Sequence, residues 1–110
     1  MSVFDVLAEP NRRRILDLLG SSEHPVGELV GRLDLSQPAV SKHLRILRDA
    51  GLVEVRGDAQ RRLYRVCPEP LRELDDWLGP YRRMWASRLE HLERHLDSMT
   101  DGNDPGEERA

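Results

Sequence analysis

The sequence predicts a mostly α-helical domain that contains one small β-hairpin. Apolar residues recur at every third or fourth position through most of the chain, change to alternation after Gly51, and return to helical spacing near residue 69. We therefore expect the element order α-α-α-α-β-β-α within one domain over residues 1–99, and a disordered acidic tail over residues 100–110.

Composition excludes several classes of protein. The chain has 110 residues, of which 34% are charged, and no apolar run approaches the roughly 20 residues that span a bilayer. Cys67 is the only cysteine, so one subunit can form neither an internal disulfide nor a multi-thiolate metal site. No basic region followed by an apolar signal core comes after Met1. We expect a cytoplasmic protein with no membrane partner, whose small core favours self-association.

The first three helices have local start and stop signals. We expect the first over Val3–Leu7, the second from Pro10 to about Leu19, and the third from Pro25. A tight turn at residues 33–35 should then lead into a fourth helix.

The fourth helix is the best-marked element of the chain. Ser36 is a good N-cap, Pro38 is tolerated in the first turn, and Gly51 suits the left-handed residue after the helix end. The apolar residues of the inward stripe are Val40, Leu44 and Leu47. Two short helices joined by a few residues, the second capped and amphipathic, are typical of a helix-turn-helix that binds DNA. The residues expected to contact DNA are Ser36, Gln37, Pro38, Ala39, Ser41, Lys42, His43 and Arg45.

Within that set the roles differ. Gln37, Ala39 and Ser41 are placed for base edges, whereas Lys42 and Arg45 suit either a base or a phosphate. His43 borders the apolar stripe and could equally be a packing residue. Arg48, near the helix end, could simply pair with Asp49 or Glu54.

A basic hairpin should follow the helix-turn-helix. Val53 and Val55 alternate on one strand, residues 63–66 form a second strand, and residues 57–61 form the loop between them. A hairpin in this position is a wing, so we predict a winged helix-turn-helix. The wing residues expected to contact phosphates or a narrow minor groove are Arg56, Arg61 and Arg62.

The charge distribution agrees with a DNA-binding segment. Residues 36–65 carry a net charge of +4, although the whole chain has a formal net charge of -3. The flanking parts are acidic, with -2 over residues 1–35 and -5 over residues 66–110. Such polarity orients a protein toward a polyanion, and double-stranded DNA is therefore the expected partner.

The last helix, expected over about residues 69–99, carries an apolar seam that the small domain cannot cover alone. Gly79-Pro80 falls inside the seam, and because the stripe stays in phase we expect a kink or a close restart. We predict a homodimer whose dimerisation helices are residues 3–8 and 69–99. The predicted interface residues are Val3, Phe4, Leu7, Leu74, Leu78, Tyr81, Trp85, Leu89, Leu92 and Leu96.

Taken in order, these segments resemble the ArsR/SmtB family of small bacterial winged-helix repressors. The segments that carry the resemblance are residues 7–16, Val26-Gly27-Glu28-Leu29, residues 36–44 with Leu47, Ala50-Gly51-Leu52-Val53 and Arg62-Leu63-Tyr64-Arg65. The resemblance implies an obligate dimer with terminal helices at the interface, operator binding that blocks transcription, and release by a ligand or another signal.

The chain departs from the metal-sensing members of that family. Residues 25–31, before the fourth helix, contain no thiolate. His91 and His95 lie one turn apart on the last helix, but Arg94 and Ser98 occupy the positions three residues after each of them, which is not the spacing of the family's zinc site. We therefore predict no metal and no cofactor, although a dimer could still bring ligands together.

Several alternatives stay open. Arg12-Arg13-Arg14 could touch phosphates or form a solvated helix face, and Trp77, Tyr81, Met84 and Trp85 could line an effector cavity or simply the interface. The rival functions are a metal-responsive sensor with a His/carboxylate site on the last helix and a winged-helix module that binds protein. No arrangement of residues points to an enzyme. The favoured function is a sequence-specific repressor that binds a palindromic operator.

Overall fold

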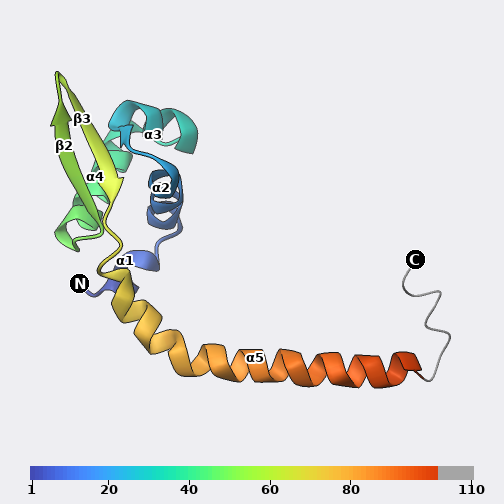
Figure 1. The fold of residues 1–110 in the computed structure, drawn as a ribbon. Coiled ribbons are helices and arrows are strands. Elements are labelled where there is room, and N and C mark those ends of the chain that lie inside the picture. The colour runs from blue at the N-terminus through green and yellow to red at the C-terminus, as the bar shows by residue number, and fades with distance from the viewer. Residues whose placement is uncertain (102–110) are drawn as a thin grey trace. The chain divides into compact units, whose positions relative to one another are not determined.

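The computed structural model describes residues 1–101, with side chains through residue 99. The chain separates into a first unit, Met1–Asp75, and a second unit, Asp76–Ala110. The first unit holds helices and a small sheet, which Figure 1 shows, and this arrangement confirms the predicted mostly helical fold with a hairpin. None of the described helices is long and apolar enough to span a bilayer.

The four helices of the first unit follow their sequence signals closely. Ser2 and Asp5 cap the first helix reciprocally, because each accepts a hydrogen bond from the other's backbone N–H. Glu9 caps the second helix through a 3.0 Å hydrogen bond from the Arg12 N–H, and Pro10 occupies its first position. The helices are α1 (Val3–Leu7), α2 (Pro10–Ser21), α3 (Val26–Leu33) and α4 (Gln37–Asp49).

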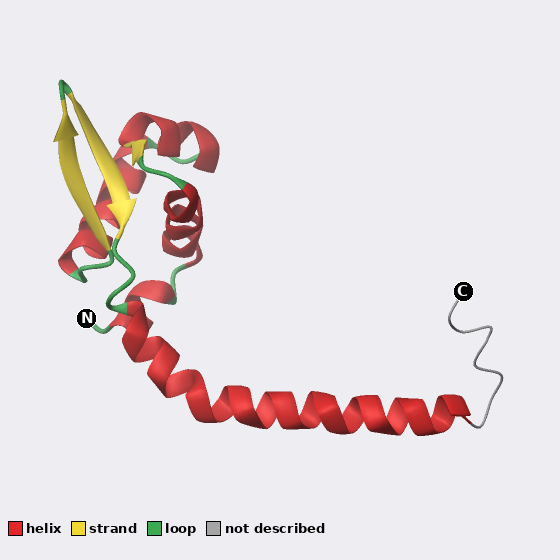
Figure 2. Ribbon diagram, in the orientation of Figure 1, coloured by secondary structure: helices red, strands yellow, loops and turns green. Residues whose placement is uncertain are grey.

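The sheet has one strand more than the sequence predicts. Strands β1 (His24–Pro25), β2 (Val53–Asp58) and β3 (Arg61–Val66) lie in the order β1-β3-β2 and are antiparallel, as Figure 2 shows. The two-residue β1 gives no alternation signal, so only its pairing with β3 defines it. The predicted loop over residues 57–61 is also shorter, because only Ala59 and Gln60 separate the long strands, with Ala59 at a φ of 57°.

The core of the first unit lies where α2, α3 and α4 meet the sheet. Its largest fully buried side chains are Ile15, Leu29, Leu44, Leu47 and Leu52. Val3 also belongs to this core and is only 6% exposed. Val3, which is predicted to serve a dimer interface, packs into the core of its own chain, and Leu7 packs partly against the same core.

The last helix, α5 (Leu71–Asp101), runs through Pro80 without a restart. Helical hydrogen bonding on both sides of Pro80 keeps the apolar seam in register. The helix extends to Asp101, and the remainder of the predicted tail over residues 100–110 lies outside the described residues.

Candidate nucleic-acid interface

The turn between α3 and α4 fixes the start of α4, the candidate recognition helix. Asp34 adopts the left-handed conformation, with φ 56° and ψ 43°, and its N–H donates to the Val30 carbonyl at 3.2 Å. Ser36 then accepts a 3.2 Å hydrogen bond from the Ala39 N–H, which satisfies one free donor of the first turn. The turn at Asp34 and the cap at Ser36 therefore fix where α4 begins and how it leaves α3.

The two faces of α4 divide cleanly into a buried face and an exposed face. Val40, Leu44 and Leu47 are buried, as the helical period predicts. The exposed polar side chains are Gln37, Ser41, Lys42, Arg45 and Arg48. Within the part of the chain that the structure describes, none of these five makes a side-chain hydrogen bond or ion pair, so Arg48 does not pair with an acidic neighbour. Uncompensated donors and cations along one helix face suit a polyanionic partner.

His43 differs from the other predicted contact residues. Its side chain is only 15% exposed, and its Nε2 lies 3.7 Å from Glu9 Oε2 at the start of α2. Its Nδ1 is buried and has no hydrogen-bond partner among the described residues. The sequence leaves two roles open for His43, and the burial of its side chain beside Glu9 favours packing over a DNA contact.

Two of the three predicted wing arginines form ion pairs with acidic side chains of the same chain. Arg56 donates two hydrogen bonds to Glu23, at 2.7 and 2.8 Å, and Arg61 lies 3.3 Å from Asp58. The hydrogen bonds from Arg56 hold the pKa of the Glu23 carboxyl below its ordinary value. In this conformation Arg56 and Arg61, which are predicted to contact phosphates or a narrow minor groove, each have an intramolecular carboxylate partner.

Arg62 is the exception in the hairpin. It is exposed and has no hydrogen bond or ion pair to any residue that the structure describes. Arg65, three residues on, pairs with Glu54 across the two long strands. Of the predicted wing residues, Arg62 alone keeps its full charge available to a ligand.

Comparison with known proteins identifies the family. The family model described as "Bacterial regulatory protein, arsR family" matches residues 9–55, which include α2, α3 and α4. The HTH-type transcriptional regulator Rv2034 of Mycobacterium tuberculosis is 37% identical over 98 residues, covering 89% of each chain. The chain belongs to the ArsR family. Its relatives are transcriptional regulators, which confirms the predictions of a DNA-binding regulator and of a protein that is not an enzyme.

Two further proteins show the same likeness. The transcriptional repressor SdpR of Bacillus subtilis is 30% identical over 77 residues, covering 70% of this chain and 86% of that one. A solved ArsR-like transcriptional regulator from Rhodococcus sp. RHA1 matches with a TM-score of 0.65 and 30% identity, over 84% of this chain and 87% of that one. The match to a solved regulator supports the winged-helix fold of this ArsR-family chain.

Three consecutive arginines of this ArsR-family chain bind helix ends. Arg12 Nε donates to the Val6 carbonyl at 2.7 Å, and Arg13 donates to the Leu7 carbonyl at 2.6 Å. Arg14 donates to the Leu33 carbonyl at 3.3 Å. These carbonyls lie at the C-terminal ends of α1 and α3, so the guanidinium groups satisfy acceptors that have no partner within their own helices. In this conformation the three arginines hold helices together.

A buried histidine on β1 carries no local sequence signal that marks it as a site residue. His24 is 7% exposed; its Nδ1 donates to Glu28 Oε2 at 2.6 Å, and its Nε2 lies 3.1 Å from Ser22 Oγ. The hydrogen bond from His24 lowers the pKa of the Glu28 carboxyl. The four-residue spacing of His24 and Glu28 is visible in the sequence, but no local pattern predicts that His24 lies on a strand.

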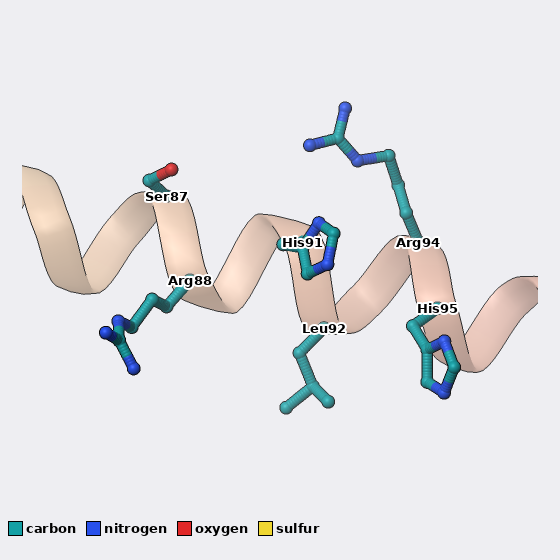
Figure 3. A pocket seen from close by; sticks show the side chains of 6 residues that line it. All are labelled: Ser87, Arg88, His91, Leu92, Arg94 and His95. Carbon is teal, nitrogen blue, oxygen red and sulfur yellow. The ribbon is translucent and has the colours of Figure 1, made fainter.

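The histidines of α5 form no metal centre within the described residues. His91 and His95 lie one turn apart, and Figure 3 shows Arg94 pointing away from both imidazoles. The part of the chain that the structure describes contains no cluster of three or more His, Cys, Asp or Glu that could hold a metal ion.

Cys67 follows β3 and is partly buried, and this burial raises the pKa of its thiol.

Proposed function

We propose that this chain is a homodimeric repressor that binds a palindromic operator through α4 and the wing. The observation that carries the proposal is the exposed face of α4, where Gln37, Ser41, Lys42 and Arg45 have no side-chain partner among the described residues. The start of a recognition helix normally contacts base edges in the major groove. Repression is the favoured outcome because the similar SdpR is named as a repressor.

Within this proposal the contact residues have separate roles. Gln37 and Ser41 read base edges, because they lie in the first turns of α4. Lys42 and Arg45 bind phosphates or bases, and Arg62 of the wing binds a phosphate. Ser36, Pro38 and Ala39 shape the helix start, with the Ser36 side chain already used as the cap.

The apolar seam of α5 supports dimerisation. In the second unit Trp85 is 64% exposed and Leu92 is 50% exposed. The other large side chains of the seam that are exposed there are Tyr81, Leu89 and Leu96. An amphipathic helix with so much exposed apolar surface is typical of a protein interface, and a second copy offers an identical seam. Phe4 of α1 is also exposed and is proposed to join this interface, with Leu7, Leu74 and Leu78 contributing their exposed parts.

The DNA-binding part of the proposal is tested by selecting genomic fragments with the purified full chain and sequencing them. We expect an imperfect inverted repeat whose half-sites lie one helical turn, about 34 Å, apart. Gln37→Ala should relax the sequence preference at defined positions, because it removes a base-edge contact and no charge. Recovery of fragments with no shared sequence would overturn the operator proposal.

The dimer is tested by sedimentation of the full chain at micromolar concentration. Trp85→Glu places a charge in the seam and should yield a monomer. Ser87→Glu is the matched control, because Ser87 lies on the opposite side of the same helix and should leave the dimer intact. A wild-type chain that sediments as a monomer would refute the proposed assembly.

No metal or cofactor takes part in this proposal. The described residues hold no cluster of potential metal ligands, and residues 25–31 lack a thiolate. The aromatic side chains Trp77 and Tyr81, whose ring centroids lie 5.0 Å apart, are assigned to the interface and not to an effector cavity.

A further inference from the structure

One ion pair joins the wing to the segment that precedes β1. Arg56 of β2 donates through Nε and Nη2 to the two carboxylate oxygens of Glu23, at 2.7 and 2.8 Å. The two residues are 33 positions apart in the sequence. A two-pronged contact between a guanidinium and a carboxylate fixes direction as well as distance. The pair can therefore orient one part of the first unit against another.

The position of this pair in the sheet gives it its importance. Pro25 of β1 pairs with Leu63, and Leu63 pairs with Arg56, which makes this the last row that contains three strands. Beyond it the hairpin has two strands only, through the pairs Gly57–Arg62 and Asp58–Arg61. Two-stranded ribbons twist easily and are weakly stable on their own. The direction of the tip is therefore set at the row that holds Arg56.

The backbone contributes little to that row. Pro25 has no N–H to donate to β3, and β1 contributes only two residues to the ladder. The side-chain contact from Glu23 spans the central strand and supplies a constraint that the short ladder lacks. Both side chains of the Glu23–Arg56 pair remain partly exposed to solvent.

We propose that Glu23 is a positioning residue for DNA binding, which acts through Arg56 to hold the wing tip so that Arg62 meets the phosphate backbone. This inference rests on the proposed function. In this role Arg56 works by geometry, since its charge is already matched by Glu23. The acidic residue therefore strengthens the binding of a polyanion, which is the opposite of what its own charge would do.

The sign of one substitution tests the proposal directly. Glu23→Gln removes a negative charge beside the wing, and simple electrostatics predicts tighter binding to a duplex. The positioning role predicts that Glu23→Gln lowers the association constant several-fold. This loss of affinity should not exceed the loss caused by Arg62→Ala. Binding would be measured by fluorescence anisotropy of the full chain with a labelled duplex at fixed salt. If the wild type binds the duplex and Glu23→Gln binds it equally or more tightly, the inference is overturned, whereas the proposed function is not.

A double-mutant cycle separates positioning from direct contact. In the Arg62→Ala background, Glu23→Gln should cause no further loss of affinity, because the contact that Glu23 positions has been removed. Additive losses would assign a separate DNA contact to the Glu23–Arg56 pair and refute the inference. A reversed pair, Glu23→Arg with Arg56→Glu, keeps the wild-type net charge and should bind about as tightly as the wild type, whereas a direct phosphate contact by Arg56 predicts weaker binding than the wild type.

Two controls guard the interpretation. Glu54→Gln removes the acid of a second wing ion pair, which lies entirely within the hairpin, and should not weaken DNA binding, because it removes the same charge without loosening the contact to β1. Urea unfolding of each variant checks that the fold is retained, which is expected because exposed ion pairs contribute little to stability. Failure of the wild type to bind any duplex would overturn the proposed function, and this inference with it.

Discussion

Replacing Arg62 with alanine should change how strongly DNA binding depends on salt. In the proposed dimer, Lys42, Arg45 and Arg62 have no intramolecular acidic partner among the described residues. With Lys42 and Arg45 in the phosphate role, each subunit makes three phosphate contacts. Six such contacts predict that log affinity falls against log salt with a slope of about -5, at roughly 0.9 per phosphate. Arg62→Ala removes two contacts from the dimer and should reduce the slope to about -3.6.

The assay is a salt titration with a labelled duplex of arbitrary sequence, because non-specific binding depends almost wholly on this electrostatic contribution. Between about 50 and 200 mM salt, the wild-type affinity should fall by roughly 10³-fold and that of Arg62→Ala by roughly 10²-fold. Arg65→Ala is the matched control, since Arg65 lies on the same strand but is paired with Glu54. A slope that Arg62→Ala leaves unchanged, or that Arg65→Ala reduces equally, would refute this account of the wing charges.

Three further predictions concern the fold. Leu44→Ala should lower the free energy of unfolding in urea by about 2–5 kcal/mol, because Leu44 lies on the buried face of α4; a loss well under 1 kcal/mol would contradict the packing. Ala59→Gly should raise the melting temperature, because the left-handed conformation costs an alanine about 1 kcal/mol and costs a glycine almost nothing. A lower melting temperature would contradict the presence of that strain. Glu28 has a lowered pKa, so its carboxylate stabilises the fold above its ordinary pKa of 4.5 and this contribution is lost as pH falls through the lower folded value. Stability should therefore depend less on pH in that acidic range for Glu28→Gln, and equal pH dependence in the two proteins would disprove the link.

Elements defined by neighbouring residues were predictable from the sequence. The boundaries of α4 follow from Ser36, Pro38 and Gly51, each of which acts within a few residues of the helix end. The inward stripe follows from the helical period in the same way. By contrast, β1 exists only because it pairs with Tyr64 and Leu63, about forty residues away. Local patterns carry no information about such a partner, and a two-residue strand has no period of its own.

The candidate DNA surface was predictable in outline, but its charges were not. The net charge of +4 over residues 36–65 located the basic segment correctly on α4 and the hairpin. A count of charges cannot tell which arginines are already paired. Glu23 lies outside the basic segment, and its contact with Arg56 depends on the sheet order that places β1 across β3 from β2. The number of available wing cations is therefore a property of the tertiary structure.

The arginine triplet of α2 illustrates the same separation between charge and role. Arg12 and Arg13 lie in the first turns of α2, where the positive end of the helix dipole disfavours a cation. That cost is offset because their guanidinium groups lie at carbonyls of the C-terminal, negative end of α1. Arg14 reaches the last carbonyl of α3 in the same way, directly before the turn that leads into α4. A single helix thus fixes both the N-terminal helix and the entry to the reading helix, so a basic run within an acidic flank can serve the geometry of DNA binding without touching DNA.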